Sequence, residues 1–236
     1  IDLNCSEENQ WVPIGTSSNP FKGILDGKNY RIKGIYINSE NQRQALFNYN
    51  NGTIQNINSI KGEIRGTYYV AGIVVENQTG GKILNCTNEV EIYASANFNA
   101  GIVASNSGII ENCENRAYME LNAISGGICG GNTNSGIIRK CFNISEILLK
   151  DFNIGGIIGE NFGTVEECYN LENILAPSGY ARYSKGGIVG NNKGTIKRCY
   201  NLGTVTGSTN WSLGGIAGSN GGTIEFSYNA GEVVGR

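Results

Sequence analysis

The sequence predicts an all-β protein, a right-handed parallel β-helix of about eight coils with a period near 28 residues. Three observations predict this fold: a phrase that recurs seven times, residue columns that repeat in register, and a composition that favours strands and turns. The chain has 236 residues, of which 35 are glycine and only 3 are proline. Repeats of this length are typical of solenoids, in which each unit buries its apolar face against the next one.

The recurring phrase contains a glycine, two apolar residues, an asparagine, a second glycine, a cysteine and a second asparagine. Clear copies are GIVASNSGIIENCEN at 101–115, GIIGENFGTVEECYN at 156–170 and GIVGNNKGTIKRCYN at 187–201. The first unit, ALFNYNNGTIQNI, lacks the opening glycine and the cysteine, so we expect a less regular coil there. The seven units begin near residues 45, 72, 101, 127, 156, 187 and 215.

Residues 1–20 lie before the repeats, and we expect them to form an N-terminal strand and a cap that lead into the first coil. Residues 21–37 supply that coil, and residues 21–236 together are expected to form the parallel β-helix. The chain starts at Ile1 rather than at a methionine, so we expect it to be part of a longer protein.

Columns of one residue type recur at the same place in the units, as stacked coils require. Stacked amides can hydrogen-bond from coil to coil, which lowers the cost of burying them. The first amide column is Asn50, Asn77, Asn106, Asn132, Asn161, Asn192 and Asn220. The second is Ser59, Asn88, Asn115, Asn143, Asn170, Asn201 and Asn229. Two apolar columns that predict a dry core are Ile54, Ile83, Ile110, Ile138, Val165, Ile196 and Ile224, and Ile92, Met119, Ile147, Ile174, Val205 and Val233.

An exposed column changes the sign of its charge from unit to unit. Its members are Gln55, Leu84, Glu111, Arg139, Glu166, Lys197 and Glu225. Opposite charges on neighbouring strands stabilise a sheet and like charges destabilise it, so the alternation favours parallel strands in register. A propeller, whose repeats meet blade to blade, would not explain it. A further column is expected to form an outward aromatic stack, and its members are Phe142, Tyr169, Tyr200 and Tyr228.

The chain has seven cysteines, of which Cys5 and Cys129 lie outside any column. The column occupied by Ile57 and Ser227 in the outer units holds the other five, Cys86, Cys113, Cys141, Cys168 and Cys199. We expect buried, free thiols, because parallel Cβ atoms one strand spacing of about 4.8 Å apart exceed the Cβ separation of a disulfide. A metal site is the alternative, but structural zinc sites use close cysteine pairs, so we expect no metal.

Three stretches carry a resemblance to a known family: WVPIG at 11–15, FKGILDGKNYRIKGIYI at 21–37, and the repeated GIVGxNxGTIxxCYN. The chain resembles bacterial secreted and surface proteins with the GLUG motif, including immunoglobulin-A-cleaving metallopeptidases and adhesin-like proteins. The resemblance covers almost the whole chain and implies a right-handed parallel β-helix on an exported protein, secreted or at the cell surface. It does not bring the peptidase chemistry, because that family's zinc motif needs histidines and this chain has none.

Composition excludes several classes of function. Without histidine, Ser-His-Asp and Cys-His catalysis and histidine metal sites are excluded. The net charge of −2 gives no basic surface for nucleic acid. No apolar run approaches the length that crosses a bilayer, so we expect no membrane insertion, and no motif calls for a cofactor.

Catalysis by a carbohydrate-active β-helix would need paired carboxylates, for which Glu166 and Glu167 are the candidates. Along the column, however, the flanking residues of Glu166 are the cations Arg139 and Lys197. This pattern favours a salt-bridge ladder, so we expect no catalytic residue.

The best candidates for a ligand-binding surface are residues of the loops that come shortly before the opening glycines. Aromatic side chains bind sugars and protein partners by stacking and burial, and their shared place in the units predicts one row along an edge of the rod. The candidates are Tyr68, Tyr69, Phe98, Phe152, Tyr180, Arg182, Tyr183 and Trp211.

Together, the repeats and the resemblance favour a non-enzymatic repeat module of an exported bacterial surface protein. It would act as a stalk or as an adhesive surface for a host glycan or an extracellular protein. Two alternatives stay open. One is a polysaccharide lyase or glycosidase built on a parallel β-helix, and the other is a substrate-recognition segment of a larger peptidase.

Overall fold

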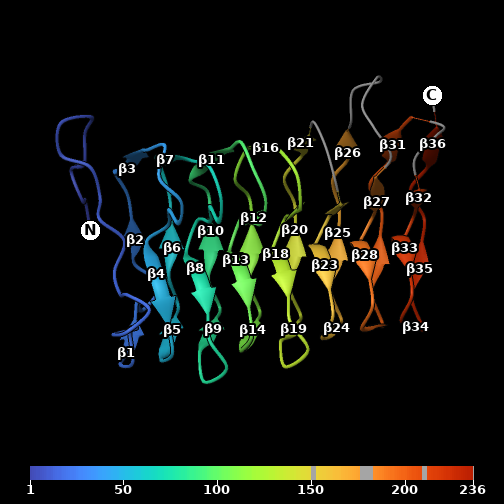
Figure 1. Cartoon of the computed structure of the whole chain (residues 1–236), viewed down its shortest axis with the longest axis horizontal. Helices are drawn as coiled ribbons and strands as arrows, with labels where there is room; N and C mark the ends of the chain where they lie inside the picture. Colours follow the sequence, from blue (N-terminus) through green and yellow to red (C-terminus); the bar gives the residue numbers. More distant parts are fainter. Residues whose placement is uncertain (150–152, 176–182, 209–211, 236) are drawn as a thin grey trace.

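The protein is a parallel β-solenoid, whose coils lie side by side along one long axis (Figure 1). The computed structural model describes residues 1–149, 153–175, 183–208 and 212–235. Within these ranges the chain forms strands and turns and no helix. Each coil contributes one strand to each of several parallel sheets, so the predicted fold class and the period near 28 residues are confirmed.

Three sheets have eight strands each, which gives eight rungs. Sheet 1 consists of β1 (Ile24–Asp26), β5 (Thr53–Gln55), β9 (Lys82–Leu84), β14 (Ile109–Glu111), β19 (Ile137–Arg139), β24 (Thr164–Glu166), β29 (Thr195–Lys197) and β34 (Thr223–Glu225). Sheet 2 consists of β2 (Arg31–Ile32), β6 (Asn58–Ser59), β10 (Thr87–Asn88), β15 (Glu114–Asn115), β20 (Phe142–Asn143), β25 (Tyr169–Asn170), β30 (Tyr200–Asn201) and β35 (Tyr228–Asn229). Sheet 3 consists of β3 (Ile35–Asn38), β7 (Gly62–Gly66), β11 (Glu91–Ala94), β16 (Met119–Leu121), β21 (Ile147–Leu149), β26 (Ile174–Leu175), β31 (Val205–Gly207) and β36 (Val233–Gly235).

Two further sheets complete each coil between sheet 3 and the next strand of sheet 1. Sheet 4 consists of β12 (Asn99–Ala100), β17 (Ser125–Gly126), β22 (Ile154–Gly155), β27 (Ser184–Gly186) and β32 (Ser212–Gly214). Sheet 5 consists of β4 (Phe47–Asn50), β8 (Val74–Asn77), β13 (Val103–Asn106), β18 (Cys129–Asn132), β23 (Ile158–Asn161), β28 (Val189–Asn192) and β33 (Ala217–Asn220).

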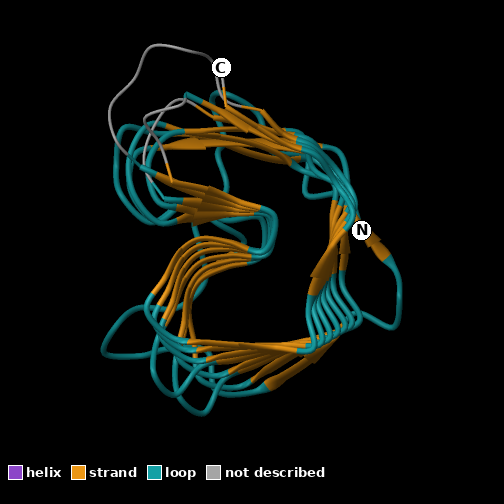
Figure 2. Cartoon of the chain, turned by 90° about the vertical axis from the view of Figure 1, so that its right-hand side faces the viewer, coloured by secondary structure: helices purple, strands orange, loops and turns teal. Residues whose placement is uncertain are grey.

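Seen along the axis, the coil is not convex, because the chain turns inward between sheet 4 and sheet 5 (Figure 2). The repeated glycines make this turn possible, because the backbone of sheet 4 lies directly against that of sheet 5 there. A Cβ on Gly155 of β22 would lie 2.1 Å from the carbonyl oxygen of Ile158, and one on Gly190 of β28 would lie 2.4 Å from the nitrogen of Ile154. Only glycine permits so close an approach.

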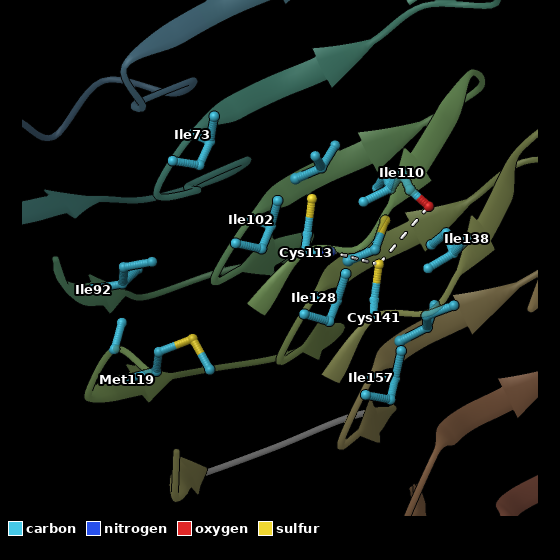
Figure 3. Packing of buried hydrophobic residues seen from close by; sticks show 14 of the residues in the cluster. Ile73, Ile92, Ile102, Ile110, Cys113, Met119, Ile128, Ile138, Cys141 and Ile157 are labelled. Carbon is cyan, nitrogen blue, oxygen red and sulfur yellow. Dashed lines mark hydrogen bonds between the residues drawn. The ribbon is translucent and has the colours of Figure 1, made fainter. Parts of the chain in front are cut away.

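Buried apolar side chains fill the interior in columns that run along the axis (Figure 3). The two predicted apolar columns are fully buried except in the last rung, where Ile224 and Val233 are 38% and 43% exposed. A third column, which the repeat phrase contains as its first apolar residue, lies at the inward turn. Its buried members are Ile73, Ile102, Ile128, Ile157 and Ile188.

Both predicted amide columns form ladders that are buried up to the last rung, where Asn220 and Asn229 are exposed. In the first, each side-chain amide donates to the amide oxygen one rung further on, for example Asn132 to Asn161 at 2.9 Å and Asn161 to Asn192 at 2.8 Å. The second ladder runs in the same way from Asn115 to Asn229, with distances of 2.8–2.9 Å. Each rung is therefore tied to the next by side chains as well as by the strands.

The cysteine column is buried and its thiols are free, as predicted. The sulfur atoms also accept backbone hydrogen bonds from the preceding rung: the N–H of Cys113 donates to Sγ of Cys141 at 3.4 Å, and that of Cys141 to Sγ of Cys168 at 3.5 Å. In the last rung Oγ of Ser227 accepts the N–H of Cys199 at 3.0 Å. A cysteine or serine at this position thus satisfies a backbone donor that would otherwise be buried alone.

The two exposed columns also follow their predicted register. Arg139 pairs with Glu111 at 2.7 Å, whereas Glu166 is bound by Arg198, the residue after Lys197 of the column. The rings of Phe142, Tyr169, Tyr200 and Tyr228 are stacked on the outer face of sheet 2, with successive centroids 4.8, 4.8 and 5.3 Å apart.

Residues 1–20 lie against the first rung. The strand expected at Ile1 is an isolated bridge between Asp2 and Lys33, and the indole N–H of Trp11 donates to the carbonyl oxygen of Leu46 at 3.0 Å. The first unit is also less regular than the others, as predicted, because its turn from Gln44 to β4 is one residue shorter than the turn in the next unit.

Candidate functional site

The predicted binding residues that the structure describes all lie in the loops between sheet 3 and sheet 4. These are Tyr68, Tyr69, Phe98 and Tyr183. Phe152, Tyr180, Arg182 and Trp211 lie outside the described residues. Tyr69 and Phe98 meet, whereas Tyr68 precedes the stack and is exposed.

Tyr69 and Phe98 form the centre of a stack over sheet 5. Their rings are 5.2 Å apart and nearly parallel, with 11° between the planes, and the guanidinium of Arg43 lies 4.9 Å from the centroid of the Tyr69 ring. All three residues have a left-handed backbone, with φ of 68° at Arg43, 58° at Tyr69 and 64° at Phe98. Such a backbone costs a bulky residue about 1–2 kcal/mol, which the stack offsets.

The aromatic row does not continue at the same position in the later rungs. The strand register places Ser184 where the stack has Phe98, so that Tyr183 comes one residue before that position. Ile124 and Asn153 occupy the two rungs between them. The stack is therefore confined to the rungs of Arg43, Tyr69 and Phe98 among the described residues.

A hollow of about 210 Å³ lies beside this stack, and we call it the aromatic groove. Loop residues form one side, residues of the turn after sheet 5 form the other, and half-buried positions of sheet 5 lie between them. Gly131 leaves room for the Phe98 ring, because a Cβ there would come within 3.1 Å of it, closer than an ordinary contact. The lining residues are Tyr69, Phe98, Ser105, Gly131, Asn132, Thr133, Glu160 and Phe162.

Sequence reasoning missed Glu160 and Phe162. Glu160 is half-buried on β23, and its Oε1 accepts a hydrogen bond of 2.8 Å from the side chain of Asn153, which holds the carboxylate in place. Phe162 is 41% exposed, and Nζ of Lys193 lies 5.0 Å from its ring centroid. The available signal was their place next to the amide column, where Glu160 is two residues before Phe162 in the copy GIIGENFG.

A second hollow, of about 340 Å³, lies on the sheet 3 side of the same loops, and we call it the polar groove. Arg65 and Tyr93 are among its lining residues, with the guanidinium 3.8 Å from the ring centroid. Glu63 binds Arg65 through two hydrogen bonds of 2.6 and 3.1 Å, which raise the pKa of Arg65. Burial, together with the hydrogen bond to Glu91, raises the pKa of Tyr93.

The other two candidate sites that the sequence offered are a metal site and the carboxylate pair of Glu166 and Glu167. Among the described residues, no group of three or more histidine, cysteine, aspartate or glutamate side chains could hold a metal ion. Glu166 and Glu167 both bind Arg198, with Oε1 of Glu167 3.1 Å from its Nε. Their carboxylates are thus engaged in a surface ion-pair network.

No family model matches the chain, and neither a curated protein nor a solved structure matches it. No helix long and apolar enough to cross a membrane occurs in the described ranges. The function must therefore be inferred from the geometry of the grooves.

Proposed function

We propose that the chain is a non-enzymatic binding module of an exported bacterial surface protein and that the aromatic groove holds a sugar ring of a glycan. The observation that carries the proposal is the combination of Tyr69, Phe98 and Phe162 with polar side chains in one hollow. A sugar ring presents C–H groups on its faces and hydroxyl groups around its edge. Aromatic rings pack against the faces, and carboxylate and hydroxyl oxygens accept from the edge.

The groove has the right polar groups for such a ligand. Oγ of Ser105 can donate and accept, whereas Oγ1 of Thr133, which donates to Ser107 at 3.0 Å, and the carboxylate of Glu160 can accept, so that the hydroxyl groups of a sugar ring find both donors and acceptors. Its volume of about 210 Å³ is enough for part of a sugar chain but not for a large ligand. A long glycan would continue along the rod, where the parallel loops repeat similar backbone groups at each rung.

The same geometry favours binding over cleavage. A glycosidase uses two carboxyl groups about 5 to 9.5 Å apart across the scissile bond. Glu160 is the one carboxylate among the described residues that line the aromatic groove. A lyase or glycosidase is therefore the less favoured alternative.

Two parts of the proposal rest on the sequence alone. The exported, surface-attached location rests on the resemblance to GLUG-motif proteins, and a stalk role rests on the repeated coils. With about 4.8 Å between strands, the rod of eight rungs is roughly 34 Å long, and this is the length that a stalk would use. A substrate-recognition role within a larger peptidase would use the same groove.

The test is retention of the chain on a panel of immobilised host and bacterial glycans, with the length of each glycan measured afterwards. Phe98→Ala is the test variant, and Tyr200→Ala, on the aromatic stack of sheet 2, is the matched control. We expect retention without shortening, lost in Phe98→Ala and kept in Tyr200→Ala. Shortening would favour the enzyme, and equal retention of both variants would exclude the aromatic groove.

A further inference from the structure

We propose that the aromatic groove selects glycans that carry protonated amines, that is, amino sugars with free amino groups. The inference rests on the proposed function and adds the charge of the ligand to it. Its basis is the electrostatic character of the lining: three aromatic rings and one carboxylate surround the hollow, a combination that attracts a cation.

Glu160 supplies the full negative charge. Of the described residues that line the groove, it alone carries a formal charge. One of its oxygens, Oε1, accepts the hydrogen bond from Asn153, and Asn153 in turn accepts one of 3.4 Å from the backbone N–H of Ser184. The carboxylate is thus oriented by neighbouring loops, which leaves Oε2 to receive an ammonium group.

Two cations among the described residues lie on aromatic rings that line the groove, and both are already engaged. Arg43 lies on the Tyr69 ring and is paired with Glu76 at 3.0 Å, so its charge is balanced within the stack. Lys193 is exposed to solvent and lies over the ring of Phe162 at 5.0 Å, so that water and salt screen it. The contacts of both cations are thus with groups other than the Glu160 carboxylate.

The π faces add to this preference. An ammonium group within about 6 Å of an aromatic centroid is attracted by the ring, and the attraction grows when water is partly excluded. The groove therefore offers an amino sugar a charge-assisted hydrogen bond, and a cation–π contact where a ring face is not already occupied by Arg43 or Lys193. An N-acetylated sugar keeps the apolar contact and its hydroxyl hydrogen bonds but lacks the positive charge, and an acidic sugar meets repulsion from Glu160.

The test measures, by calorimetry in mildly acidic buffer, the affinity of the whole chain for three oligosaccharides of equal length. These are a glucosamine oligomer, an N-acetylglucosamine oligomer and a galacturonate oligomer. We expect the highest affinity for the glucosamine oligomer, a lower one for the N-acetylglucosamine oligomer and the lowest for the galacturonate oligomer. Glu160→Gln should weaken binding of the glucosamine oligomer about tenfold and leave that of the N-acetylated oligomer unchanged.

A control separates the groove from general attraction between a cationic glycan and an acidic chain. Glu225→Gln removes a carboxylate of β34 in sheet 1, which does not line the groove, and should leave all three affinities unchanged. Equal affinity for amine and N-acetyl oligomers, or an unchanged affinity in Glu160→Gln, would overturn the amino-sugar preference and leave glycan binding intact. Failure of all three oligomers to bind would overturn both.

Discussion

The side chain of Asn170 packs directly on the backbone of Gly156, so closely that a Cβ on Gly156 would lie 2.4 Å from Cγ of the asparagine. The same relationship joins Gly127 to Asn143 and recurs in other units. It explains two positions of the repeat phrase together: the opening glycine leaves the space that the amide ladder of sheet 2 occupies. The amide in turn bonds to the next rung, so the glycine is required by the ladder.

Replacing this glycine tests the relationship. In Gly156→Ala the new methyl group would meet Asn170 and the carbonyl oxygen of Gly187 at 2.3 Å, so we expect a loss of about 2–3 kcal/mol or more in the free energy of unfolding. The matched control is Gly221→Ala, where the nearest atom lies at 3.8 Å. Urea denaturation of both variants should show the loss in Gly156→Ala alone, and equal stability would refute the packing.

The amide ladder of sheet 5 predicts a dependence on position. Asn161 donates to Asn192 and accepts from Asn132 inside the protein, so Asn161→Ala leaves buried polar groups without partners and should cost about 2–3 kcal/mol. Asn220→Ala, at the exposed end of the ladder, should lower the free energy of unfolding by less than about 1 kcal/mol, because water can replace the lost amide. Thermal or urea unfolding of the two alanine variants would compare them. A similar loss in both would argue against a buried ladder.

The buried thiols predict a loss of stability in alkaline solution. Burial raises the pKa of the Cys129 thiol above its ordinary value of 9.0, and burial likewise raises that of Cys141. The folded state therefore keeps the thiols protonated where the unfolded state releases the protons. This stability is present below the unfolded pKa and is lost as the pH rises above it.

Urea midpoints measured across that pH range should fall for the native chain. Cys129→Ala removes one of the shifted groups, so its midpoint should fall less steeply with pH than that of the native chain. Parallel curves for the two proteins would mean that the Cys129 thiol is not buried.

The charged column of sheet 1 predicts only a small effect. Arg139 is partly exposed, and its contact with Glu111 at 2.7 Å is a surface ion pair. Arg139→Glu should therefore lower the free energy of unfolding by about 1 kcal/mol or less, and the loss should shrink in high salt. A failure of this variant to fold would show that position 139 faces the core.

The fold could be predicted because each coil repeats the same few contacts. The Asn ladders, the apolar columns and the cysteine column each align one residue type with itself, which only a parallel in-register stack explains. The inward turn between sheets 4 and 5 was not predicted. The glycines that permit it, such as Gly155 and Gly190, mark close backbone approaches whose partners the sequence does not name.

The candidate site was predicted in part. The loops were identified correctly as the place where Tyr69 and Phe98 lie, but the alignment of loops of unequal length depends on the strand register. Tyr183 therefore falls one residue away from the position of the stack. Glu160 and Phe162 come from the repeat phrase itself, where each occupies a position that holds a different residue in the next unit.

The most direct test of the central claim is the structure of the chain bound to a glucosamine oligomer. The account predicts a sugar ring in the aromatic groove, packed against Phe98 or Phe162 and with its amine within hydrogen-bond distance of Glu160. A sugar bound instead in the polar groove beside Arg65 and Tyr93, or on the aromatic stack of sheet 2, would contradict it.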